Sequence, residues 1–217
     1  MLTILIISIP SLLSAQELQE KQKPEKHEFE DVPDWLRRTS YGAIFETDNK
    51  PRAYLETVQP LYQWPDETKA IFTHDRISMH EYRGTYSTGL GFRNLMFDGK
   101  LLGGVNTFFD YQDLRKHYRW GIGFEAITER LEARLNEYYG LSDRRTVEET
   151  STTYTYEKAV DGFDAELGTP VPYLPWIKVF GSYYQYDFKN FEDMKGWKGR
   201  VEIKPFKALV FNVETFD

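Results

Sequence analysis

The residues of this chain that could carry chemistry are four histidines, a serine that follows a glycine, and two glycine-rich tetrapeptides. The histidines (His27, His74, His80 and His117) form neither a His-x-x-x-His helix nor a ligand cluster, so the sequence predicts no metal site. Ser182 lies in FGSYY, inside a predicted strand rather than in the Gly-x-Ser-x-Gly turn that exposes a nucleophile. GLGF (89–92) and GIGF (121–124) lack the third glycine and the following helix of a dinucleotide-binding loop. We therefore predict a protein that is not an enzyme, with no catalytic residue, metal or cofactor.

The composition narrows the class of protein further. The chain has 217 residues, a formal net charge of -7 and no cysteine, so disulfides and thiolate metal sites are excluded. The acidic balance argues against nucleic acid as a partner, which would need a basic patch. Past the N-terminus no apolar run is long enough for a membrane-spanning helix. A spanning β-barrel remains possible, because its alternating strands average to a polar hydropathy.

The N-terminus differs from the rest of the chain. Residues 1–15 contain an apolar core from Leu2 to Leu13, followed by Ser14 and Ala15, and they predict a signal peptide that is cut near Ala15. A buried N-terminal helix is the alternative. Residues 16–38 are charged and poor in apolar side chains, so we expect a disordered periplasmic leader.

From Thr39 onward, apolar and polar residues alternate with the period of two that is typical of β-strands. Residues 126–140 also permit a helical interpretation, but Tyr138, Tyr139 and Gly140 end a helix badly. Most predicted strands are about as long as the ~9–11 residues that a tilted strand needs to cross a bilayer. The eleven predicted strands lie near residues 40–47, 52–62, 68–77, 85–95, 99–111, 117–127, 130–141, 158–168, 176–187, 195–205 and 207–216. We therefore predict an all-β fold over residues 39–217, a transmembrane antiparallel outer-membrane β-barrel.

The alternation assigns two faces to this barrel. The residues predicted to face lipid are Leu90, Phe92, Val105, Phe109, Trp120, Ile122, Phe124, Val201 and Ile203. The residues predicted to line the lumen are Arg93, Asn106, Asp110, Arg119, Glu125, Arg134, Lys178, Arg200 and Glu202, and Arg130 and Glu132 share their pattern. Glycines of the inner set, Gly89, Gly91, Gly121 and Gly123, leave room for larger inward neighbours.

Two interpretations of the inward charges stay open. Cross-strand ion pairs would fix the strand register, whereas a polar lining could hold a linker or pass small solutes. Asn106 and Asp110 share a face, and a structural network on the inner wall is favoured over a ligand site. A set of aromatic residues near strand ends predicts interfacial girdles: Tyr138, Tyr139, Tyr173, Trp176, Tyr183, Tyr184, Tyr186 and Trp197.

The connections between the predicted strands alternate in length. Short ones lie near residues 63–67, 98–99, 128–129, 168–175 and 205–207, and longer or more charged ones near 48–51, 78–84, 112–116, 142–157 and 188–194. Outer-membrane barrels have short periplasmic turns and longer outer loops, so residues 142–157 should be an outer loop. An odd number of strands cannot close as an antiparallel barrel, and we therefore expect a chain that is incomplete at its C-terminus, with a gap or a poor parallel contact between the first and last predicted strands.

Four blocks carry a family resemblance: GLGFRN (89–94), LLGGVNTFFDYQD (101–113), HYRWGIGFEAITERLEARLNEYYGLS (117–142) and DGFDAELGTPVPYLPWIKVFGSYYQY (161–186). In this order and spacing they resemble the inverse autotransporter β-domain, the outer-membrane barrel of intimin- and invasin-type adhesins. The resemblance implies a twelve-stranded barrel in the outer membrane of a Gram-negative bacterium, which anchors and helps to export a C-terminal passenger while a linker helix threads the pore.

The expected partners are outer-membrane lipid, the barrel-assembly machinery, periplasmic chaperones and the chain's own passenger segment. The alternative function is a passenger-less, porin-like pore. A barrel enzyme that acts on lipids is a third hypothesis, and it would need Ser182 as its nucleophile.

Overall fold

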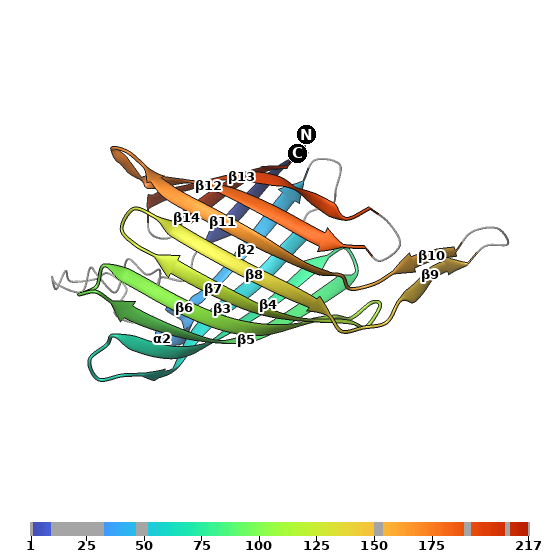
Figure 1. Cartoon of the computed structure of the whole chain (residues 1–217), viewed down its shortest axis with the longest axis horizontal. Coiled ribbons are helices and arrows are strands. Elements are labelled where there is room, and N and C mark those ends of the chain that lie inside the picture. The colour runs from blue at the N-terminus through green and yellow to red at the C-terminus, as the bar shows by residue number, and fades with distance from the viewer. Residues whose placement is uncertain are drawn as a thin grey trace.

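The computed structural model describes residues 2–9, 33–46, 52–149, 154–188, 192–206 and 209–216, and nearly all of them lie in antiparallel β-strands. Eleven strands follow one another around a single sheet. A further strand, β1 (Leu2–Ile9), pairs with both edges of that sheet and closes it into a barrel (Figure 1). A separate hairpin, β9 (Arg145–Glu149) and β10 (Tyr154–Glu157), projects from one end of the barrel (Figure 1).

Each of the eleven strands of the sheet overlaps one predicted strand, so the prediction of an all-β antiparallel barrel is confirmed. The strands are β2 (Thr39–Glu46), β3 (Arg52–Gln63), β4 (Lys69–His80), β5 (Arg83–Met96), β6 (Leu101–Gln112), β7 (His117–Ile127), β8 (Glu132–Gly140), β11 (Asp161–Val171), β12 (Leu174–Asp187), β13 (Met194–Phe206) and β14 (Leu209–Phe216). The helical alternative for residues 126–140 is wrong, because that stretch contains the end of β7 and all of β8.

The strand β1 is the main departure from the sequence prediction. Leu5 lies opposite Val213 of β14 and opposite Phe45 of β2, and both pairings are antiparallel. The expected gap or parallel contact between β2 and β14 is therefore wrong, and so is the alternative of an N-terminal helix. Leu2–Ile9 is apolar at both alternating sets of positions, so it lacks the alternation by which the other strands were predicted. Cleavage near Ala15 stays a prediction, and residues 10–32 lie outside the described residues.

A short helix, α2 (Asp34–Arg37), precedes β2 in a segment that was predicted to be disordered. The carbonyl oxygen of Trp35 accepts hydrogen bonds from the Thr39 hydroxyl (2.8 Å) and from Nε2 of Gln59 on β3 (3.0 Å). These bonds satisfy a carbonyl group at the helix end. They tie the helix to the sheet, which explains why the described residues 33–38 are ordered.

The observed connections between strands differ in part from the predicted lengths. Asp98 and Gly99 both have positive φ, as the Asp-Gly pair predicts, within a turn that joins β5 to β6. The predicted short connection at 168–175 narrows to two residues, since β11 continues to Val171 and β12 begins at Leu174. The connection at 78–84 is predicted among the longer or more charged ones, and in the structure only Glu81 and Tyr82 join β4 to β5.

The burial pattern of the described residues is inverted relative to a soluble protein. The buried hydrophobic side chains are Phe72, Leu102 and Phe180, whereas many large apolar side chains are exposed. Buried polar and charged residues are more numerous, namely Ser40, Asp110, His117, Glu132, Ser142, Ser182, Asn212 and Glu214. The polar side of the sheet is therefore the one that the barrel encloses. Within the described segments, no helix is long and apolar enough to cross a membrane.

Candidate functional site

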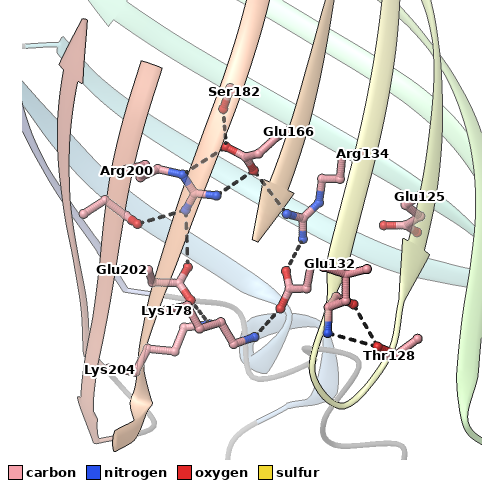
Figure 2. Close-up of polar contacts among 12 residues, drawn as sticks. Glu125, Thr128, Glu132, Arg134, Glu166, Lys178, Ser182, Arg200, Glu202 and Lys204 are labelled. Atoms are coloured by element: carbon pink, nitrogen blue, oxygen red, sulfur yellow. Dashed lines mark hydrogen bonds and ion pairs between the residues drawn. The ribbon is translucent and has the colours of Figure 1, made fainter. Parts of the chain in front are cut away.

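The centre of the enclosed polar surface is Glu166 on β11, which lies between two arginines (Figure 2). Arg200 on β13 donates two hydrogen bonds to its carboxylate, from Nη2 to Oε1 (2.7 Å) and from Nε to Oε2 (3.3 Å). Arg134 on β8 donates from Nη1 to Oε1 (3.3 Å), and the Ser182 hydroxyl on β12 donates to Oε2 (3.0 Å). One carboxylate thus joins four neighbouring strands.

A second carboxylate extends the cluster along β8. Glu132 accepts a hydrogen bond from Nη2 of Arg134 (2.9 Å) and forms an ion pair with Lys178 of β12 (Figure 2). On the other side, Arg200 approaches Glu202 (3.7 Å), which in turn pairs with Lys204 (3.0 Å). Alternating charges therefore run without interruption across β8, β11, β12 and β13.

A fourth carboxylate, Glu214 on β14, lies on the same side of the barrel. Oε1 of Glu214 lies 3.8 Å from Nε of Arg200. Nη1 of the same arginine donates a hydrogen bond to Oδ1 of Asn212 (3.2 Å). Arg200 also covers the ring of Phe180 at 3.7 Å from the centroid. The guanidinium is thus held by acids, an amide and an aromatic face together, and such bidentate, stacked geometry suits arginine better than lysine.

Three ion pairs skip a strand, which shows that they form on the concave side of the sheet. Arg200 reaches Glu166 across β12, and Lys178 reaches Glu132 across β11. Arg93 of β5 reaches Glu125 of β7 across β6, with Nε donating to Oε1 at 2.5 Å. Side chains two strands apart converge in this way only where the sheet curves toward them.

Glycines make room for the larger inward side chains. A Cβ built at Gly91 would collide with the ring of Phe72, and one at Gly121 would collide with the ring of Phe108. The arginine over Phe72 is Arg93, 4.6 Å from the ring centroid. The prediction that the inner glycines accommodate larger neighbours is therefore confirmed at these positions.

The polar wall also lines an open cavity of about 670 Å³. Its lining comes from β8, β11, β12 and β13, and includes Arg134, Asp164, Glu166, Lys198 and Arg200. The Tyr138 hydroxyl on β8 donates to Oδ2 of Asp164 (2.5 Å). Acids and bases thus alternate around the cavity, which can bind a polar segment or solute through several charged groups.

The structure brings most of the predicted lumen residues into pairs. Arg93 pairs with Glu125 and Asp110 with Arg119, whereas Arg134, Lys178, Arg200 and Glu202 share the cluster around Glu166. Asn106 lies beside Asn136, since a Cβ at Gly123 would touch both amides. The prediction that Arg130 faces the lumen is wrong, because this residue occupies an exposed turn between β7 and β8.

The residues predicted to face lipid occupy the opposite face of the same strands, by the alternation of the pleat. Those that are clearly exposed are Leu90, Val105, Phe109, Trp120 and Phe124, and those that are half-buried are Phe92, Ile122, Val201 and Ile203. The exposed fraction of Leu90 is 51%. Their contact with lipid stays a prediction.

The predicted aromatic girdle is wrong for three of its members. Tyr138, Tyr184 and Tyr186 line the cavity rather than the outer surface. Trp197, with 64% of its surface exposed, packs edge-on against Tyr183 on the other face. Consecutive tyrosines in a strand point to opposite sides, so a run such as 183–186 cannot belong to one face.

Sequence reasoning did not select Glu166 or Asp164, although the alternation in β11 could have revealed them. Ala165 separates the two carboxylates in the sequence, and Leu167 follows Glu166. Ala165 and Leu167 therefore belong to the apolar set of β11, and the two acids belong to the polar set. Ser182, which a lipid-acting barrel enzyme would need as its nucleophile, is 3% exposed, and its hydroxyl donates to Glu166. Among the described residues, no group of histidine and acidic side chains could hold a metal ion.

Comparison with known proteins gives a family and a fold. The model of the family described as inverse autotransporter, beta-domain, matches residues 14–216. The inverse autotransporter adhesin YeeJ of Escherichia coli strain K12 is 30% identical over 196 residues, which cover 84% of this chain and 8% of the adhesin. A putative attaching and effacing protein homolog of the same strain is 27% identical over 164 residues, covering 72% of this chain and 53% of that protein. The chain thus spans about half of one relative and a small part of the other.

One solved structure shares the fold. A chain from a study of the in-meso crystallization of membrane proteins superimposes with a TM-score of 0.65 over 100% of this chain and 83% of its own length, at 15% identity. At this identity the likeness concerns the fold alone.

Proposed function

The chain belongs to the inverse autotransporter β-domain family, and on that premise we propose that it is an outer-membrane barrel that anchors a passenger segment and helps to export it to the cell surface. On this proposal the chain resides in the outer membrane of a Gram-negative bacterium. The expected partners are outer-membrane lipid, the barrel-assembly machinery, periplasmic chaperones and the passenger itself.

The observation that carries this proposal is the inverted distribution of polarity in the barrel. Every backbone group inside a membrane must be paired within the protein, and a closed antiparallel sheet meets that demand. Apolar side chains such as Leu90 and Phe124 are exposed on the outside. Charged groups such as Glu166 and Arg200 lie inside. A barrel with these two faces is suited to lipid outside and to a polar chain segment or water within.

A passenger-less pore is the second candidate function, and the cavity of about 670 Å³ favours it. The charges around this cavity are paired with one another, so a small ion would compete with pairs that are already formed. A peptide segment can instead add hydrogen bonds along its length to several of these groups at once. Passenger export therefore fits the paired charges of the cavity better than passage of small ions does.

The test uses the full gene product with an epitope placed C-terminal to Asp217. We expect protease added to intact cells to remove the epitope, because export brings the passenger outside. The control measures the barrel in the same cells by the shift in electrophoretic mobility between heated and unheated samples, which reports folding independently of export. A folded outer-membrane barrel whose epitope is cut only after lysis would contradict the proposal. Ion conductance of the purified barrel in planar bilayers would then favour the pore.

A further inference from the structure

Aromatic rings gather on the outer face of β5–β8, near the end from which the β9–β10 hairpin projects. Tyr111 lies 5.1 Å from Tyr118 and 6.3 Å from Tyr86, measured between ring centroids. Phe109 continues the row at 5.7 Å from Tyr118. Trp120 stacks on Tyr139 at 5.1 Å. Four of the six rings are exposed. The two groups of rings adjoin where Phe109 lies opposite Trp120, so they form one aromatic surface over four neighbouring strands.

Basic side chains lie directly beyond these rings. Arg115 and Lys116 occupy the connection between Tyr111 and Tyr118, and Arg144 and Arg145 begin a few residues after Tyr139. Arg115 and Lys116 are two or three residues from Tyr118, and Arg144 and Arg145 are five and six residues from Tyr139. We refer to the six rings and these four cations together as the aromatic–basic face.

The two basic loops are fastened to each other. The Leu141 N–H donates to the Tyr118 carbonyl (2.9 Å), and a hydrogen bond of 2.8 Å joins Nδ1 of His117 to the Ser142 hydroxyl. Arg145 is the register partner of Glu157, whose carboxylate lies 3.9 Å from Nε2 of His117. The cations of the two loops are therefore gathered at one place on the rim rather than dispersed around it.

This concentration of positive charge is local in an acidic chain. The net charge is -7, and the described turns at the opposite end of the same strands are acidic on balance. Those turns contain Asp66, Glu67, Asp98 and Glu129 against Lys100 and Arg130. The loop end of β6–β8 instead carries the four cations beside Asp113, Asp143 and Glu157, while Glu148 and Glu149 lie further along the hairpin. Two of these acids are engaged by other groups, since Oδ1 of Asp113 accepts a hydrogen bond from the Gly84 N–H and Glu157 lies 3.6 Å from Arg83.

We propose that the aromatic–basic face binds a phosphorylated glycolipid of the outer leaflet, with its acyl chains against the rings and its phosphates against the loop cations. The proposal rests on the proposed function, which places the loop end of the barrel at the outer surface. Aromatic rings are favoured where acyl chains meet head groups. Arginine forks match phosphate geometry with paired, charge-assisted hydrogen bonds. A lipid whose acyl chains lie along the strands and whose phosphates lie at the loops matches the positions of the rings and the cations.

The test measures lipid binding to the purified barrel in a neutral detergent by native mass spectrometry. The probes are lipid A with both phosphates and the same lipid after removal of its phosphates. The loop variants are the pairs Arg115→Gln with Lys116→Gln, and Arg144→Gln with Arg145→Gln. The matched control is Lys100→Gln with Arg130→Gln, which removes the same charge from exposed turns at the opposite end.

We expect phosphorylated lipid A to bind the unaltered barrel and each loop pair to weaken that binding by roughly tenfold. The control pair and the dephosphorylated lipid distinguish phosphate recognition at this face from general charge attraction and from acyl-chain binding. Equal affinity of the loop variants and the unaltered barrel, or equal binding of both lipids, would overturn the proposal. Because the measurement needs only a folded barrel in detergent, its result is separable from failure of the export assay.

Discussion

Glu166 on β11 and Arg200 on β13 meet across the intervening strand β12, with Oε1 of the acid 2.7 Å from Nη2 of the arginine. Both side chains are 13% exposed. A pair that spans three strands restrains their curvature as well as their register, since neither partner can reach the other if the sheet flattens. The inner ion pairs are therefore part of what gives the barrel its shape.

Replacing Arg200 by Met should lower the free energy of unfolding by about 2–3 kcal/mol. The change leaves a largely buried carboxylate that keeps only the weaker donors Arg134 and Ser182. Urea unfolding in lipid vesicles measures the loss, with Arg130→Met in an exposed turn as the control. The double variant Glu166→Gln with Arg200→Met should cost less than the sum of the single changes, and additive losses would show that the two side chains are not coupled.

Replacing Gly168 by Ala should cost about 1–3 kcal/mol, because a Cβ at this position overlaps the ring of Phe180 on the neighbouring strand. Gly181 supplies the matched control. A Cβ there meets nothing within 4 Å, so Gly181→Ala should be close to neutral. Adding Phe180→Leu should restore part of the stability of the Gly168 variant. If both glycine variants unfold at the same urea concentration as the unaltered barrel, the ring does not occupy that space in lipid.

An arginine on the outer face should cost more than one on the inner face of the same strand. Leu90→Arg places a charge on the exposed outer surface of β5, where we expect a loss of ~2–4 kcal/mol if the position lies at mid-bilayer. Ser87→Arg places it on the enclosed side between Asp110 of β6 and Arg76 of β4, and should cost less than the change at Leu90. Unfolding in vesicles measures both variants, and a barrel that loses equal stability from each would not be embedded in lipid as proposed.

The alternation of residues predicted the strands well, because one face of each strand lies toward the enclosed polar interior and the other toward the apolar outer surface. At 117–127 the apolar and polar sets are cleanly interleaved, and β7 has the predicted bounds. The aromatic assignment failed where tyrosines occur on both sets, as in Tyr183 and Tyr184, since a tyrosine suits a polar cavity as well as an interface. The network centred on Glu166 was missed for another reason. Its partners come from three other strands, and pairing across an intervening strand depends on curvature that no local pattern encodes.

A tag inserted after Glu149, in the β9–β10 hairpin, should be accessible to antibody on intact cells. This hairpin projects from the loop end of the barrel (Figure 1). A tag beside Asp98, in the turn between β5 and β6, lies at the opposite end and should be accessible only after lysis. Labelling of the Asp98 tag alone on intact cells would reverse the orientation assigned here.

The last prediction concerns the strand that closes the barrel. The strands from β2 to β14 make an odd number, so β2 and β14 run in the same direction and could meet directly only as a parallel pair. The strand β1 is antiparallel to both and lies between them. Without it, two rows of backbone groups lose their partners, and each unpaired group in lipid costs several kcal/mol. The apolar segment that suggests a signal peptide thus occupies the position on which closure depends.

Refolding of the purified chain into detergent tests this dependence, because no signal peptidase is present. The chain with residues 1–15 should give a heat-modifiable barrel in higher yield than the chain that starts at residue 16. The protein has no cysteine, so Leu5→Cys with Val213→Cys introduces a single pair, and these residues are register partners. We expect this pair to form a disulfide in the refolded barrel, whereas Leu5→Cys with Val201→Cys should not, since Val201 lies one strand further away on β13. Equal yields of the two chains, together with no cross-link at Val213, would mean that β1 does not close the barrel and that β2 and β14 pair with another strand.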